Sequence, residues 1–128
     1  MSKRTILIAE DDSDVRALTE RVLARFGDYR IQSYDDGNDL DKRLKGGLDG
    51  VALVITDNDV AERDLGLNII RRYASTLQIP FILMSADNSL VLEQKAIEAG
   101  AYAFVAKPYR INSLRRIVQN ALNEKQSA

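Results

Sequence analysis

Short, almost wholly apolar runs alternate along the chain with stretches in which apolar residues recur every three or four positions. A short apolar run is typical of a strand buried on both faces, and the longer spacing is typical of a helix with one buried side. The predicted strands cover residues 6–9, 29–34, 51–56, 81–84 and 103–106. The predicted helical stripes cover residues 15–26, 39–44, 67–74, 92–99 and 114–121. The pattern therefore predicts five strand–helix units in a row.

The order of these units predicts the fold class. Apolar strands that alternate with helices are typical of a parallel sheet covered on both faces. Right-handed crossovers then produce a doubly wound α/β fold with five strands and five helices. Glycines mark the predicted helix ends, with Gly27 after the first stripe and Gly100 after the fourth. The last helix is expected to fray over residues 124–128.

Composition narrows the chemistry that the chain can perform. Its 128 residues suit a single domain over residues 1–128, with a core over about 4–123. The chain contains no Cys and no His, which excludes disulfides, thiolate zinc sites and imidazole catalysis. Any chemistry must therefore use carboxylates, Lys, Ser, Thr or Tyr.

The net charge and the hydropathy of the chain bear on its cellular location and on its binding partners. With 18 basic and 19 acidic residues, the net charge of −1 argues against a direct nucleic-acid partner. The apolar run at residues 6–9 is too short for a secretion signal, and no apolar stretch is long enough to cross a membrane. We therefore expect a cytoplasmic protein without a membrane partner.

Polar residues with matching chemistry follow four of the predicted strands. In a doubly wound fold the functional crevice lies at the carboxyl ends of the strands. The residues there are Glu10, Asp11 and Asp12 after the first strand, Asp57, Asn58 and Asp59 after the third, Ser85 after the fourth and Lys107 after the fifth. Each alone has an ordinary explanation as a helix cap, a turn residue or a surface amine, and Asp12 and Ser13 are expected to begin the first helix. The coincidence at four strand ends favours a shared site.

Clustered carboxylates beside an amine suit phosphoryl transfer. Neighbouring carboxylates repel one another, and a bound cation relieves that repulsion. Because only oxygen ligands are available, the expected ion is Mg²⁺. A metal ion and a Lys together neutralise the charge of a phosphoryl group, and a carboxylate can serve as the nucleophile. Ser85 can donate a hydrogen bond to a phosphoryl oxygen.

Four segments resemble those of the response-regulator receiver family of two-component signalling. They are residues 6–12 (ILIAEDD), 53–57 (LVITD), 82–86 (ILMSA) and 104–108 (FVAKP), and they cover essentially the whole chain in the family's order. The resemblance implies a chemotaxis-regulator-like single receiver domain with a flavodoxin-like sheet of strand order 2-1-3-4-5. It also implies that Asp57 accepts a phosphoryl group, which Lys107 binds.

The same resemblance implies a set of metal ligands. Mg²⁺ would be bound by Asp57 and Asp11 directly, by Glu10 through water and by the backbone carbonyl of Asp59. Arg16 lies where members of the family commonly have an Arg after the acidic pair, which makes Glu10 and Asp11 that pair.

A switch and two partners are implied in the same way. Ser85 and Phe104 match the family's switch pair, and the Lys107–Pro108 peptide bond is expected to be cis. The phosphodonor would be a histidine kinase or a histidine phosphotransfer protein, and a downstream protein target would contact the fourth helix, fifth strand and fifth helix. The chain would be a signalling phosphoacceptor that catalyses only its own phosphorylation and dephosphorylation, not an enzyme.

The loop after Asp57 departs from the family pattern. The family usually carries Met-Pro and then Asp-Gly there, whereas this loop has no Pro and reaches Gly66 one residue late. A longer, more mobile loop leaves its role in metal binding open and favours one alternative, a receiver-like adaptor that works without phosphorylation. Asp59 and Asp87, each two residues beyond a site residue, are expected to tune the lifetime of the acyl phosphate.

A haloacid-dehalogenase-type phosphatase is the second alternative. The segment Asp57-Asn58-Asp59 fits the Asp-x-Asp motif of that family. In that family, however, the motif ends the first core strand and the acidic metal pair comes late in the chain, whereas here two complete units precede the motif and the acidic pair comes first. A dinucleotide site is disfavoured because no Gly-x-Gly-x-x-Gly follows the first strand.

Overall fold

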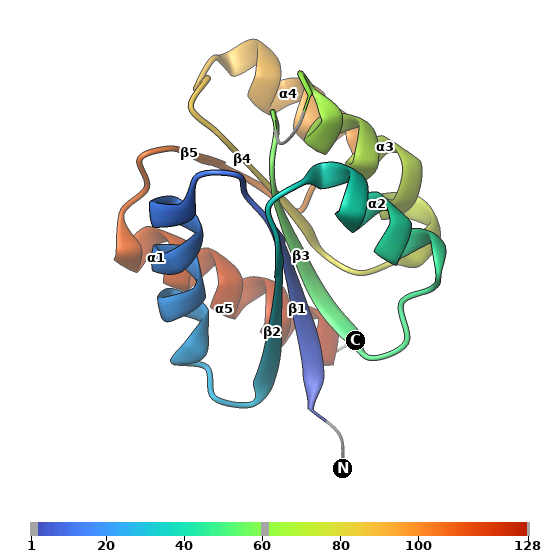
Figure 1. Cartoon of the computed structure of the whole chain (residues 1–128), viewed down its shortest axis with the longest axis vertical. Coiled ribbons are helices and arrows are strands. Elements are labelled where there is room, and N and C mark those ends of the chain that lie inside the picture. The colour runs from blue at the N-terminus through green and yellow to red at the C-terminus, as the bar shows by residue number, and fades with distance from the viewer. Residues whose placement is uncertain (1–2, 60–61, 128) are drawn as a thin grey trace.

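The computed structural model describes residues 3–59 and 62–127. Strands and helices alternate along the chain (Figure 1). Their bounds are β1 (Arg4–Ala9), α1 (Ser13–Ala24), β2 (Tyr29–Tyr34), α2 (Gly37–Lys45), β3 (Val51–Asp57), α3 (Leu65–Leu77), β4 (Phe81–Ser85), α4 (Leu90–Ala99), β5 (Ala103–Ala106) and α5 (Ile111–Ser127). The predicted series of five strand–helix units is confirmed.

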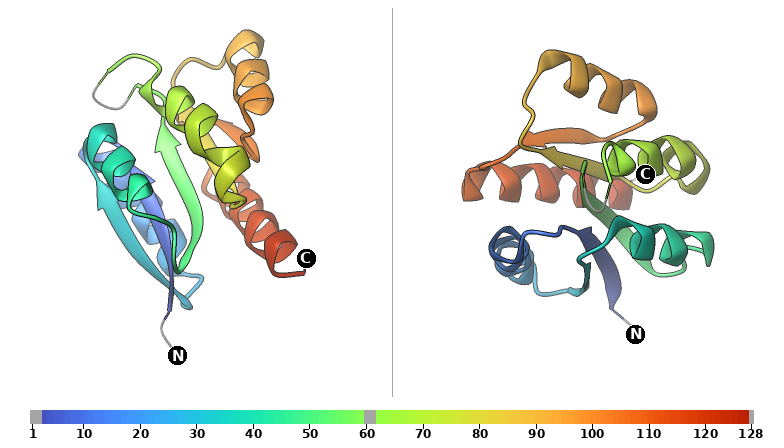
Figure 2. Two further views of the ribbon diagram at one scale, coloured as in Figure 1. Left: turned by 90° about the vertical axis from the view of Figure 1, so that its right-hand side faces the viewer. Right: turned by 45° about the horizontal axis from the view of Figure 1, so that its top comes forward.

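The five strands form one parallel sheet in the order β2-β1-β3-β4-β5. Helices cover both faces, with α1 and α5 on one side and α2, α3 and α4 on the other (Figure 2). All seven residues of the central strand β3 are buried, as its continuous apolar run predicts. The doubly wound, flavodoxin-like fold predicted from the sequence is confirmed.

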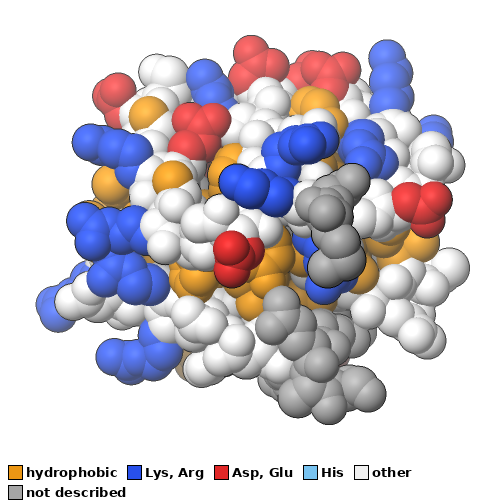
Figure 3. Space-filling model, turned by 90° about the horizontal axis from the view of Figure 1, so that it is seen from below, with side chains coloured by type: hydrophobic (Ala, Val, Ile, Leu, Met, Phe, Trp, Pro, Cys, Tyr) orange, Lys and Arg blue, Asp and Glu red, His pale blue; other side chains and the backbone are white. Residues whose placement is uncertain are grey.

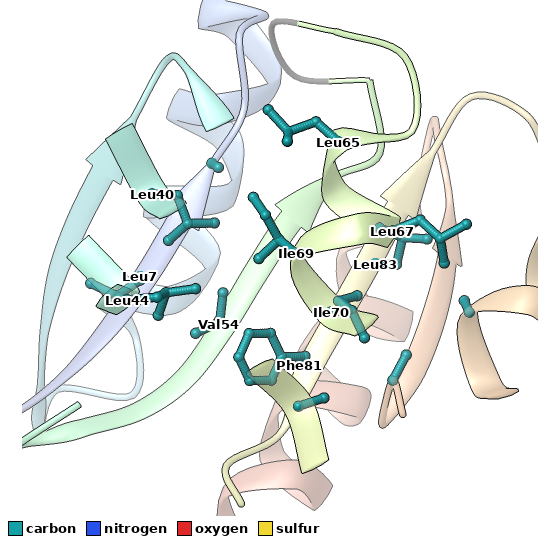
Figure 4. Packing of buried hydrophobic residues seen from close by; sticks show 14 of the residues in the cluster. Leu7, Leu40, Leu44, Val54, Leu65, Leu67, Ile69, Ile70, Phe81 and Leu83 are labelled. Atoms are coloured by element: carbon teal, nitrogen blue, oxygen red, sulfur yellow. The ribbon is translucent and has the colours of Figure 1, made fainter. Parts of the chain in front are cut away.

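Alternate strand residues divide the core into two clusters. In β1, Ile6 and Ile8 face α1 and α5, whereas Leu7 and Ala9 face the other three helices. Phe81 is among the largest fully buried side chains and belongs to the second cluster, which α2, α3 and α4 cover (Figure 4). The three central strands β1, β3 and β4 are therefore buried on both faces, whereas the edge strands β2 and β5 are partly exposed.

Several element boundaries differ from the predicted ones. Asp57 and Ser85 are the last residues of β3 and β4, although each was expected just beyond its strand. The first helix ends at Ala24, so the prediction that Phe26 belongs to it is wrong, although Phe26 still packs against the core. Helix α5 runs to Ser127 through residues that were expected to fray. Boundaries are the least certain part of such predictions because caps and last turns are set by local hydrogen bonds.

The predictions that Asp12 begins α1 and that Gly27 follows its end are confirmed. The side chain of Asp12 caps the helix by accepting hydrogen bonds from the backbone N–H groups of Asp14 and Val15. Gly27, after the helix, has a φ of 73°, a conformation that Gly adopts without steric cost. Among the helices that the structure describes, none is long and apolar enough to cross a bilayer.

Candidate functional site

Parallel pairing brings the carboxyl ends of four strands to one edge of the sheet. Ala9 of β1 lies beside Thr56 of β3, and Ser85 of β4 lies beside Ala106 of β5. The residues that follow or end these strands therefore meet at the upper edge in Figure 1. We call the set Glu10, Asp11, Asp57, Ser85 and Lys107 the rim site.

Three carboxylates of the rim site lie close together. Glu10, Asp11 and Asp57 each offer an oxygen within 4.8 Å of the others. Glu10 is fully buried and Asp57 nearly so, whereas Asp11 is exposed. The guanidinium of Arg16 donates to the backbone carbonyl of Glu10 at 2.8 Å and fixes the chain where it leaves β1. The three side chains predicted to bind metal therefore lie in one cluster, and their role as ligands stays a prediction.

The ammonium group of Lys107 forms ion pairs with two of these carboxylates. Lys107 Nζ lies 2.6 Å from Asp57 Oδ1 and 3.0 Å from Glu10 Oε1. Burial alone would lower the pKa of Lys107, but its hydrogen bonds with Asp57 and Glu10 outweigh burial and raise the pKa. Burial raises the pKa of Glu10, although the hydrogen bond from Lys107 opposes it. Lys107 thus pairs with two of the three clustered carboxylates, and this excess of negative charge favours binding of a further cation.

The charge of this edge differs from that of the opposite end of the molecule. Figure 3 shows the protein from below, where Lys and Arg side chains are prominent. At the edge that holds the rim site, the three clustered carboxylates attract a small cation. The donors there are oxygen atoms, which suit a hard divalent ion such as Mg²⁺.

Ser85 and Phe104 share one face of the sheet. Phe104 lies beside Leu83, and Ser85 follows Leu83 by two residues, so their side chains point to the same side. Ser85 Oγ accepts a hydrogen bond from the backbone N–H of Asp87 at 3.0 Å, and Phe104 is partly buried. The Lys107–Pro108 peptide bond is cis, as predicted.

Asp59 stands apart from the carboxylate cluster. Its side chain is exposed, and its Oδ1 accepts a hydrogen bond from the backbone N–H of Asp64 at 3.0 Å. Its own backbone N–H donates to Asp57 Oδ2 at 3.2 Å. The prediction of a longer, mobile loop falls partly on Val60 and Ala61, which lie outside the described residues.

Sequence reasoning gave no role to Asn58 and did not consider Thr19, two buried polar residues near the rim site. Asn58 is buried and hydrogen-bonded through its side chain to both Asp64 and Leu67. Thr19 is also buried, and its hydroxyl lies 2.7 Å from that of Tyr109, just beyond the cis peptide. The available signal for Asn58 was its place directly after Asp57, the last residue of the buried strand β3.

Comparison with known proteins identifies the family. A sequence profile of the response regulator receiver domain matches residues 6–119. This chain belongs to the receiver domain family. The match covers most of the chain in one piece, so the haloacid-dehalogenase-type alternative is disfavoured.

Two relatives and one solved structure illustrate the similarity. The receiver domain is 33 % identical over 124 residues to a DNA-binding transcriptional regulator NtrC of Azospirillum brasilense, covering 96 % of this chain and 25 % of that protein. It is 27 % identical over 122 residues to the two-component response regulator ARR2 of Arabidopsis thaliana, covering 95 % and 18 % respectively. A response regulator receiver protein from Pseudoalteromonas atlantica, 20 % identical, has the same fold with a TM-score of 0.82 over 94 % of this chain and 98 % of its own.

The receiver domain thus spans a quarter or less of these two relatives. The family membership shows a receiver domain of two-component systems. The DNA binding that the NtrC name describes belongs to that longer protein.

Proposed function

We propose that this receiver domain accepts a phosphoryl group on Asp57 from a histidine kinase or a histidine phosphotransfer protein. The observation that carries the proposal is the 2.6 Å contact between Lys107 Nζ and Asp57, with two further carboxylates within 4.8 Å. An ammonium beside a carboxylate suits phosphoryl transfer, because the carboxylate can act as the nucleophile and the ammonium neutralises charge on the phosphoryl group. In the transfer, one Asp57 oxygen forms a bond to phosphorus while the bond between phosphorus and the donor's imidazole nitrogen breaks. The released nitrogen takes up a proton from solvent.

Each residue of the rim site has a role in this proposal. Asp11 and Asp57 would hold Mg²⁺ directly, Glu10 would hold it through water, and the Asp59 carbonyl would be the remaining protein ligand. The ion, when bound, neutralises charge on the transferred phosphoryl group. Lys107 holds the Asp57 carboxylate in place beforehand and contacts the phosphoryl group afterwards.

A readout surface forms the second part of the proposal. The Ser85 hydroxyl turns toward the phosphoryl group, and the ring of Phe104 turns inward on the same face of the sheet. The surface formed by α4, β5 and α5 then binds a downstream protein. Its support is the apolar surface of α4, where Leu90 is 80 % exposed, Val91 64 % and Ile97 51 %. Exposed apolar side chains grouped on one element are typical of protein-binding surfaces.

The proposal also covers the cellular location of the domain, the reactions it catalyses and its direct target. We infer a cytoplasmic signalling domain that catalyses only its own phosphorylation and dephosphorylation. A downstream protein, not nucleic acid or a membrane, is its direct target. The net charge of −1 supports this choice over a general nucleic-acid surface.

Mass spectrometry of the intact protein after treatment with a small-molecule phosphodonor tests the proposal. We expect one added phosphoryl group in the presence of Mg²⁺, little without it, and none in Asp57→Asn. Asp12→Asn is the matched control, because Asp12 is a neighbouring carboxylate outside the cluster and Asn caps a helix equally well. Wild-type protein that stays unmodified with Mg²⁺ would favour the phosphorylation-independent adaptor.

A further inference from the structure

The loop between β3 and α3 contains a buried polar side chain with no role in the chemistry described above. Asn58 is 2 % exposed and directly follows Asp57. Its Nδ2 donates to Asp64 Oδ1 at 2.8 Å, and its Oδ1 accepts from the backbone N–H of Leu67 at 3.0 Å. Both ends of the amide therefore bind residues on the far side of the loop.

Helix α3 depends on this amide for its capping. Asp64 precedes the helix in a left-handed conformation with a φ of 60°, and its side chain makes no capping hydrogen bond. The first N–H groups of a helix need an acceptor from outside the helix. Asn58 supplies that acceptor to Leu67, so the start of α3 is tied to the end of β3.

Backbone contacts close the base of the loop at the same residue. The N–H of Asn58 donates to the carbonyl of Met84 at 2.8 Å, and its carbonyl accepts from the N–H of Gly66 at 2.8 Å. A Cβ atom at Gly66 would overlap the carbonyl oxygen of Asp57 and lie 2.8 Å from Asn58 Cα. The first turn of α3 therefore packs directly on the end of β3, with no room for a side chain between them.

Asp59 is held inside this closed loop. Its N–H donates to Asp57 Oδ2 at 3.2 Å, and its Oδ1 accepts from the N–H of Asp64 at 3.0 Å. Asp64 is in turn held by the amide of Asn58. A continuous set of hydrogen bonds thus leads from Asn58 through Asp64 to the residue whose carbonyl is assigned to the metal.

We propose that Asn58 is a positioning residue that holds the backbone of Asp59 in the orientation needed to bind Mg²⁺. The loop has no Pro to restrict its backbone, and the side-chain hydrogen bonds of Asn58 and Asp59 join its two ends instead. This inference rests on the proposed function, because it requires Mg²⁺ and the Asp59 carbonyl at the rim site. Removing the amide frees Asp64, and with it Asp59, so the ion loses a preorganised ligand.

A Mg²⁺ titration of the full chain, followed by the backbone amide chemical shifts of Asp11 and Asp57, measures the effect. We expect Asn58→Ala to weaken Mg²⁺ binding about tenfold, the size of effect typical when a residue that orients a metal ligand is removed. Asp64→Gly and Asp64→Asn form a matched pair, since both remove one charge and both residue types tolerate a positive φ. Only Asp64→Asn keeps an oxygen acceptor for Asn58, so only Asp64→Gly should weaken binding.

A purely structural role for Asn58 gives a different result. It would lower the free energy of unfolding without changing the Mg²⁺ affinity of the folded protein. We expect that result for Asp41→Ala, which removes a carboxylate of α2 that accepts hydrogen bonds from Arg72 and Tyr73 of α3. If Asn58→Ala does not fold, the difference in Mg²⁺ affinity between Asp64→Gly and Asp64→Asn tests the inference alone. Affinities equal to wild type in Asn58→Ala and Asp64→Gly overturn this inference and leave the proposed function intact. Absence of Mg²⁺ binding in the wild type overturns both.

Discussion

Asp41 and Glu10 are both buried carboxylates. Asp41 is on α2 and contacts α3, whereas Glu10 belongs to the rim site. Asp41 accepts hydrogen bonds from Arg72 at 2.6 Å and Tyr73 at 2.8 Å, and Lys45 lies 3.5 Å away. Burial alone would raise the pKa of Asp41, but the hydrogen bonds from Tyr73 and Arg72 lower it below its ordinary value. Burial raises the pKa of Glu10, because the single ammonium of Lys107 does not compensate for it.

The difference lies in how many cations each carboxylate has. Asp41 pairs with the cations of Lys45 and Arg72 and accepts a hydrogen bond from the Tyr73 hydroxyl, so the protein itself compensates its charge. Within the described residues, Lys107 pairs with both Glu10 and Asp57, and the Asp11 carboxylate lies beside them without an ion pair of its own. A carboxylate with surplus partners is typical of a structural link, whereas a cluster with too few partners is typical of a site that binds something else.

The largest effect is expected from Lys107→Met. It leaves Glu10 and Asp57 buried without a cation, which costs about 3–5 kcal/mol when one partner of a buried ion pair is removed. Urea unfolding without divalent ions should show a loss of this order, and added Mg²⁺ should restore part of it. A loss that Mg²⁺ leaves unchanged would break the comparison, because the rim site would then be only a structural ion pair.

A smaller loss is expected from Asp41→Ala. The substitution leaves Tyr73 and Arg72 without their acceptor, and about 2 kcal/mol is expected because the half-exposed Arg72 is screened by water. Asp39→Ala, at an exposed position of the same helix, is the control. Mg²⁺ should not restore the loss, and phosphorylation of Asp57 should be unchanged. Restoration by Mg²⁺ would show that the two regions are not distinct.

The lowered pKa of Asp41 predicts how this loss depends on pH. A carboxylate whose pKa is lower in the folded state stabilises the fold fully above its ordinary pKa of about 3.9 and loses that effect as pH falls through the folded value. The stability difference between wild type and Asp41→Ala should therefore be constant near neutral pH and shrink below about pH 4. Urea unfolding of both proteins across this range measures it, and a difference that widens in acid would contradict the sign.

The smallest effect is expected at the entrance to the rim site. Asp59 and Asp87 are both exposed there, and their charge repels an anionic phosphodonor. Asp59→Asn keeps the oxygen that accepts from Asp64 and should raise the rate of phosphorylation by a small donor about twofold at low salt. The gain should shrink as salt screens the charge, and Asp87→Asn should have a milder effect. An unchanged or slower Asp59→Asn at low salt would show that the charge argument is wrong.

The sequence predicts most of the fold because the strands are buried on both faces. Short apolar runs such as residues 51–56, set between helical stripes, indicate buried parallel strands. The strand order then brings the carboxyl ends of the strands together. Residues at those ends were therefore predictable as a group, although their roles in the chemistry stay predictions. Phe26 was misplaced because the helical spacing of apolar residues continues two residues beyond Ala24, where local hydrogen bonds end α1.

Asp41 and Asn58 were not predictable in the same way. Asp41 lies on a polar helix and looks like a surface acid, because its partners Arg72 and Tyr73 come from α3, about thirty residues later in the chain. The cap that Asn58 gives to α3 likewise crosses a loop, whereas capping patterns in sequence are read over three or four neighbouring residues. Both contacts depend on tertiary structure that periodicity does not encode.

Locating the phosphoryl group within the chain tests the central claim most directly. The protein is treated with a small phosphodonor and Mg²⁺, digested, and the modified residue is read from fragment masses. We predict a single modification on Asp57, with Asp11, Asp59 and Ser85 unmodified. A phosphoryl group on any of those three residues, or none on Asp57, would contradict the assignment.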